Sequence, residues 1–196
     1  MYGDPNPPSA DERRTTFFAA ITGHEHAEVS GKSTNVGEML RTAYSRPDGT
    51  VDTRAASKAL KVSQRTVQRW VKGTQAPKGE NLSKLQKGSR KAATTKAGRA
   101  QAVQKQKKSA FAQKGAKLTI RGNQGVPGTN VLGQTYKRFR NASLQLTPQE
   151  YQDLLDAYAE GGDSGIHAYL ESEFSAKYGA GAWEMTYISE INFSEI

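Results

Sequence analysis

The residues with the clearest chemical signature lie in the segment 62–73, VSQRTVQRWVKG. Gln and Arg side chains end in planar groups that can pair with base edges in the major groove of DNA. If Ser63 caps a helix here, Val67, Trp70 and Val71 share one apolar stripe and the polar side chains point away from it. A helical hairpin that serves packing alone is the alternative. The side chains expected to contact DNA are Gln64, Arg65, Thr66, Gln68, Arg69 and Lys72.

Two further patterns suggest chemistry but fail on spacing or composition. The sequence GKST at 31–34 resembles a phosphate-binding loop, but His26 stands where that loop needs a glycine, five residues before Gly31. His24 and His26 flank Glu25, yet the chain has three histidines and no cysteine, so we expect no metal site. We expect no cofactor either.

The composition indicates a reducing compartment and argues against a membrane-spanning segment. Without cysteine the chain can form neither a disulfide nor a thiolate metal site, which fits a reducing environment. No apolar run reaches the roughly 18 residues that cross a bilayer. We therefore expect a cytoplasmic protein without membrane contact.

The charges of the chain are strongly segregated. Residues 81–146 carry 15 basic side chains and no acidic one, whereas residues 147–196 carry 10 acidic side chains and the single base Lys177. Like charges at this density repel unless a polyanion neutralises them, and nucleic acid is the commonest such partner. The alternative is that the basic segment folds back on the acidic end. The phosphate contacts expected in the basic segment are Arg90, Lys91, Lys107 and Lys108.

Local patterns predict a mixed α+β chain. We expect four parts, which are a largely flexible N-terminal arm (1–32) with a short helix at 15–21, a helix-turn-helix DNA-binding domain (33–80), a basic linker or arm (81–115) and a small C-terminal α+β domain (116–196) with a Gly/Pro-rich loop and an acidic end.

The helix-turn-helix needs two helices that position the segment 62–73. We expect a helix over 33–45, capped by Ser33 or Thr34, and another over 51–62. Lys61 occupies the turn, where glycine is common because that position often takes positive φ. The residues expected on the apolar face of the helix 51–62 are Ala55, Ala59 and Leu60.

In the C-terminal part, alternating and helical periodicities follow one another. Thr147 and Glu150 form a capping-box pattern at the start of a helix. A shift in the alternation of the last strand predicts a β-bulge. The expected elements are strands 116–123 and 136–146 around the loop 124–135, helices 146–162 and 164–178, and a final strand 182–196.

Several of these motifs in this order resemble the telomere terminal proteins of linear Streptomyces chromosomes and plasmids. The motifs are SQRTVQRWVKG, RKAATT, GVPGT, LTPQEYQDLLDAYAEGG and ISEINFSEI, and the resemblance covers residues 33–196. It implies a protein that primes replication and caps the 5′ ends of linear DNA. A side-chain hydroxyl then attacks the α-phosphate of the first deoxynucleotide, in the active site of a separate DNA polymerase. The chain would therefore be a primer and not itself an enzyme.

The resemblance also implies partners and a priming residue. The partners are telomeric or other double-stranded DNA, the polymerase and a telomere-associated protein, with a nucleoid-associated location. The priming residue is a threonine near the loop 124–135, and Thr129 is the first choice. The alternatives from another class are a non-covalent helix-turn-helix regulator or plasmid maintenance protein, and a DNA-packaging protein. The other candidate primers are Thr119, Thr135, Thr94 and Thr95.

Overall fold

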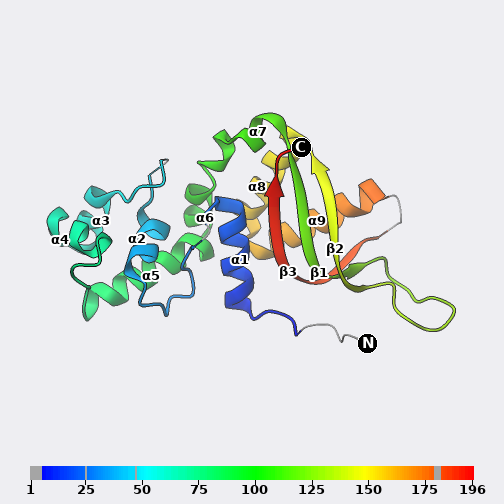
Figure 1. Cartoon of the computed structure of the whole chain (residues 1–196), viewed down its shortest axis with the longest axis horizontal. Helices are drawn as coiled ribbons and strands as arrows, with labels where there is room; N and C mark the ends of the chain where they lie inside the picture. The colour runs from blue at the N-terminus through cyan, green and yellow to red at the C-terminus, as the bar shows by residue number, and fades with distance from the viewer. Residues whose placement is uncertain (1–5, 25, 47, 179–181) are drawn as a thin grey trace.

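Two clusters of buried side chains organise the chain in its computed structural model, which describes residues 6–24, 26–46, 48–178 and 182–196. The smaller cluster, which includes Met39 and Trp70, holds together the helices at one end of the molecule (Figure 1). The larger cluster, which includes Leu118 and Tyr158, lies between an antiparallel sheet and the helices that cover it. The fold class is α+β, as the sequence predicted.

The smaller cluster is built from helices α2 (Val36–Tyr44), α3 (Thr53–Leu60), α4 (Gln64–Val71) and α5 (Glu80–Thr94). The expected apolar face of α3 was partly wrong. Leu60 is buried, but Ala55 and Ala59 are exposed, and Ala56 is the alanine that packs inward. The reason is that Leu60 and Ala56 are four residues apart, so they share one face of the helix.

The cap of α2 also differs from the expected one. Asn35, and neither Ser33 nor Thr34, caps the helix, because its side-chain oxygen accepts a hydrogen bond from the Glu38 amide at 3.3 Å. Ser33 instead accepts one from the Asn35 amide at 2.9 Å. The helix therefore starts later than its sequence pattern predicted.

The basic segment is helical and partly buried, whereas a linker or arm with almost no apolar face was expected. It contains α5, α6 (Lys96–Ala102), a 3₁₀ turn η1 (Gln106–Lys108) and α7 (Ala110–Lys114). Small and apolar residues at four-residue spacing form a buried stripe along α5. The residues of this stripe are Leu85, Ser89 and Ala93.

The sheet contains β1 (Ala116–Gly125), β2 (Arg138–Leu146) and β3 (Glu184–Ser194) in the order β2-β1-β3, all antiparallel. Helices α8 (Pro148–Gly161) and α9 (Asp163–Tyr178) lie behind it (Figure 1). The five predicted elements are all present, with ends that differ by at most two residues. β1 extends to Gly125, into the expected loop, β2 begins at 138 and not at 136, and β3 is two residues shorter at each end than the expected 182–196.

Two local predictions in this region are confirmed. Thr147 and Glu150 form the capping box of α8. The pairing of β1 with β3 changes register between Arg121 and Gly122 and again between Asn123 and Gln124, which places the bulge in the last strand. Gly122 is required there, because a Cβ at this position would lie 2.1 Å from the carbonyl oxygen of Tyr187.

The N-terminal segment is more ordered than expected. Helix α1 (Ala10–Thr22) begins before the predicted residue 15, and a capping box of Ser9 and Glu12 starts it. Phe17 and Phe18 are buried in the larger cluster, and α1 lies alongside β3 (Figure 1). The expectation of a largely flexible arm is therefore wrong for this helix, because its aromatic side chains complete the core.

Candidate nucleic-acid interface

Helix α4 is fixed at both ends by the residues that the sequence indicated. Ser63 caps it by accepting a hydrogen bond from the Thr66 amide at 3.1 Å. Lys61 takes a left-handed conformation with φ of 55°, as the turn requires. Val67 and Trp70 are buried in the smaller cluster. Anchored in this way, α4 presents most of its polar side chains to solvent.

The exposed face of α4 carries the predicted set of polar side chains. Arg65 and Arg69 form no ion pair with any described residue, so both guanidinium groups are free to donate to a ligand. Thr66 differs from the others, because it is half-buried and its hydroxyl lies 2.9 Å from that of Ser63. The exposed members of the face are Gln64, Arg65, Gln68, Arg69 and Lys72.

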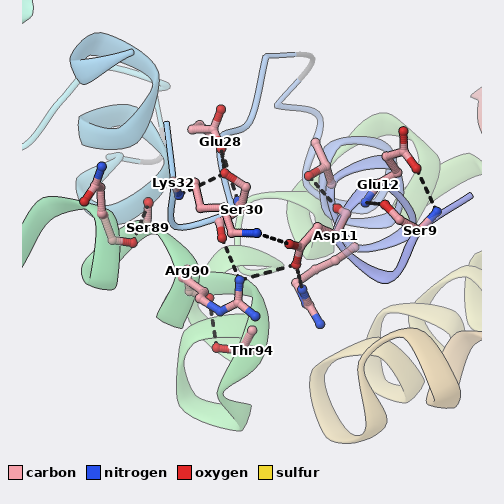
Figure 2. A network of polar contacts seen from close by, with 12 residues as sticks. Ser9, Asp11, Glu12, Glu28, Ser30, Lys32, Ser89, Arg90 and Thr94 are labelled. Atoms are coloured by element: carbon pink, nitrogen blue, oxygen red, sulfur yellow. Dashed lines mark hydrogen bonds and ion pairs between the residues drawn. The ribbon is translucent and has the colours of Figure 1, made fainter. Parts of the chain in front are cut away.

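The predicted phosphate-contacting residues fall into two groups. Lys91 and Lys108 are exposed and form no ion pair within the described part of the chain. Arg90 is engaged, because its Nη1 donates to the Ser30 carbonyl oxygen at 2.6 Å and lies 3.3 Å from the Asp11 carboxylate. Figure 2 shows this Arg90 network between α5 and the N-terminal segment. Lys107 pairs with Asp156 of α8.

The basic segment is partly neutralised by the acidic end of the chain. Lys96 pairs with Glu160 at 2.6 Å. Arg99 is buried, although it is charged, and its guanidinium donates to backbone carbonyl oxygens at the end of α8. Folding back on the acidic part thus accounts for some of these charges, whereas Lys91 and Lys108 stay without an ion-pair partner among the described residues.

The loop between β1 and β2 is a protruding hairpin with an organised tip (Figure 1). Thr129 and Thr135 form an isolated antiparallel bridge across it. The side-chain oxygen of Asn130 accepts hydrogen bonds from the Leu132 amide at 2.9 Å and the Gln134 amide at 3.0 Å. Val131 is fully exposed at the apex. The loop is therefore braced by its own polar groups while its apolar tip contacts solvent.

The five candidate threonines differ in what their hydroxyl groups contact. Thr119 lies 3.0 Å from the Ser143 hydroxyl. Thr94 and Thr95 donate to helix carbonyl oxygens at 2.9 Å, and the Thr135 hydroxyl accepts from the Lys137 amide at 3.1 Å. The Thr129 side chain is exposed, and its hydroxyl makes no hydrogen bond to any residue the structure describes.

One group of residues near α4 was missed by the sequence analysis. Val36, Gly37 and Arg41 of α2 lie across a groove from Trp70 and Lys72. The N-cap at Asn35 was the available signal, because it marks where free amides begin a helix. We refer below to this region as the α2–α4 groove.

The described residues contain no group of three or more His, Asp or Glu side chains placed to hold a metal ion. Glu25 of the histidine pattern lies outside the described residues. No helix in the described ranges is both long and apolar enough to cross a bilayer.

Comparison with known proteins gives no relative on which to base an identification. No family model matches the chain, and searches of curated proteins and of solved structures find no match.

Proposed function

We propose that the chain is a DNA-binding terminal protein that reads double-stranded DNA with α4 and primes synthesis from Thr129. The observation that carries the proposal is the free Gln/Arg face of α4, held at its start by the Ser63 cap and anchored by Val67 and Trp70. Side chains of these types form bidentate hydrogen bonds with guanine and adenine in the major groove.

The priming step needs a hydroxyl that a polymerase cleft can accept. Thr129 supports this role, since its hydroxyl is not engaged within the described residues and it lies on a protruding loop. Gly128 beside it has φ of 109°, a conformation that favours glycine and lets the backbone bend. The braced tip would hold the hydroxyl in a narrow set of positions, which lowers the entropy cost of in-line attack.

The chemistry of the step is a nucleotidyl transfer. The Thr129 oxygen attacks the α-phosphorus of a deoxynucleoside triphosphate, and a new phosphodiester bond forms between them. The bond between the α-phosphorus and its bridging oxygen breaks, and pyrophosphate leaves with the electron pair. The hydroxyl proton passes to a base or water in the polymerase, which also supplies the metal ions.

A partition experiment separates this function from a non-covalent regulator. DNA ends isolated from cells without protease are extracted with phenol and detergent, and an antibody to the chain is used to detect it on the ends. A terminal protein stays attached until nuclease releases it. Complete loss of the chain on extraction, with DNA binding retained in dilute buffer, would favour the regulator.

A further inference from the structure

The α2–α4 groove has a volume of about 410 Å³ and lies between the start of α2 and the end of α4. Its lining includes the cationic side chains of Arg41 and Lys72 and contains no carboxylate, but Arg41 pairs with Glu38 of the same helix at 2.7 Å, which partly neutralises it. Lys72 is exposed and has no ion-pair partner among the described residues. The electrostatic character of the groove therefore favours an anion.

The start of α2 adds uncompensated donors to this groove. The Asn35 side chain accepts from the Glu38 amide, and the Asn35 carbonyl oxygen accepts from the Met39 amide. The amides of Val36 and Gly37, which belong to the first turn, take part in no hydrogen bond within the described part of the chain. Such amides and the helix dipole together favour a negatively charged group.

Trp70 gives a second, independent indication of a ligand. Its side chain lines the groove and is 3% exposed, yet its indole Nε1 is buried without a hydrogen-bond partner. A buried indole N–H normally finds an acceptor, because leaving it unpaired costs free energy. Trp183 behaves in the usual way, since its Nε1 donates to Gln124 at 3.3 Å.

The position of the groove indicates where its anion comes from. Lys72 belongs both to the groove and to the exposed polar face of α4, three residues after Arg69. We propose that the α2–α4 groove binds one phosphate group of the DNA backbone, next to the bases that α4 reads. This assignment rests on the proposed DNA binding, while the shared chemistry, a phosphate group, can be tested without DNA.

The main variant is Gly37→Asp, with Gly37→Ala as its control. A Cβ at Gly37 would lie 3.4 Å from Nη1 of Arg41, the end of a flexible side chain, so both replacements fit. Aspartate near a helix start favours the fold but places a negative charge where the phosphate would bind. We expect Gly37→Asp to bind a short mixed-sequence duplex more weakly than Gly37→Ala, without a lower thermal midpoint. The slope of log affinity against log salt should fall by about 0.9, the value for one lost phosphate contact.

Indole N–H resonances provide the readout of the groove itself. Inorganic phosphate, titrated at constant ionic strength, should shift the Trp70 resonance saturably in the parent and not in Gly37→Asp. The Trp183 resonance serves as the internal control, because its N–H is already paired. The duplex should shift the Trp70 resonance as well and compete with inorganic phosphate.

The remaining outcomes overturn all or part of the proposal. A shift with inorganic phosphate but no competition by the duplex would assign the groove to a free anion and not to DNA. Equal duplex affinity and salt slope in Gly37→Asp and Gly37→Ala would remove the groove from the interface, even if Arg65→Ala weakens binding. A parent protein that binds no DNA would end the proposed function, whereas the phosphate titration would still decide whether the groove takes an anion.

Discussion

The side chain of Arg99, in the basic segment, donates a hydrogen bond to the backbone of Glu160, in the acidic part of the chain. Nη2 of Arg99 donates to the Glu160 carbonyl oxygen at 2.8 Å, and Nε of the same guanidinium donates to the Tyr158 carbonyl oxygen at 2.9 Å. The last carbonyl groups of a helix have no partner within it, so this arginine supplies donors to the end of α8. This charged residue of the basic segment thus has a structural role.

Replacing Arg99 should destabilise the fold. Arg99→Met removes the charged donors to the Tyr158 and Glu160 carbonyl oxygens, although Tyr158 still accepts from the Gly162 amide, and we expect the free energy of unfolding to fall by about 1.5–3 kcal/mol. Lys96→Met is the control, because it removes an exposed pair with Glu160 and should cost at most about 1 kcal/mol. Denaturant unfolding gives both values. Equal effects of the two replacements would contradict the structural role of Arg99.

The exposed arginines of α4 and its buried Trp70 should respond differently to replacement by alanine. Arg65→Ala and Arg69→Ala should each weaken binding to the preferred DNA site by about 1–3 kcal/mol, with the fold retained, since both side chains are exposed. Trp70→Ala should instead unfold the smaller cluster, at a cost of about 3–5 kcal/mol. Fluorescence anisotropy and circular dichroism separate the two effects. Unchanged anisotropy titrations for both arginine variants would exclude α4 as the reading helix.

Two adjacent residues of α5 provide a matched test of the basic segment. Lys91→Gln should lower the slope of log affinity against log salt by about 0.9 and leave stability almost unchanged, because Lys91 is exposed and unpaired among the described residues. Arg90→Gln should lower the free energy of unfolding by about 1 kcal/mol and change the salt slope less. The reason is that Arg90 donates to the Ser30 carbonyl oxygen and pairs with Asp11. Salt titrations of binding, combined with thermal unfolding, check both. The reverse pattern would return Arg90 to the set of phosphate-contacting residues.

The threonine assignment predicts where a labelled deoxynucleotide becomes attached. With the partner polymerase and a template, Thr129→Ala should abolish labelling, and Thr129→Ser should retain some because a hydroxyl remains. Thr135, which pairs with Thr129 in the isolated β-bridge, gives the matched control, and Thr135→Ala should keep the labelling. Peptide mapping of the product gives the position. Label on Thr119, Thr135, Thr94 or Thr95 would change the residue and keep the mechanism, while no label with a proven polymerase would exclude priming.

Local sequence signals predicted much of the fold because their causes are local. The caps at Ser63 and Thr147, the left-handed Lys61 and the bulge in the last strand each depend on a few neighbouring residues. The start of α1 was missed although Ser9 and Glu12 have capping-box spacing, because proline and aspartate around them suggested disorder.

The parts that failed depend on contacts between distant residues. The sequence indicated Arg90 as a phosphate-contacting residue from charge alone, but its partner Ser30 lies 60 residues earlier in the chain. Helical spacing predicted which side chains of α4 are exposed. That the Thr129 hydroxyl makes no hydrogen bond to a described residue can be seen only in the folded loop. No local pattern shows which of several basic or hydroxyl groups form hydrogen bonds or ion pairs in the tertiary structure.

The two buried clusters imply an order of events during synthesis. Every residue of the smaller cluster falls between Val36 and Leu85, so this core is complete in sequence before any strand of the sheet has been made. The larger cluster extends from Phe17 to Ile191, and β1 at the centre of the sheet pairs with the last strand of the chain. On the ribosome, α4 can therefore reach its native packing while one side of β1 still lacks its neighbour. An unpaired strand edge is prone to associate with other chains, so the sheet is the part that depends most on rapid completion of translation.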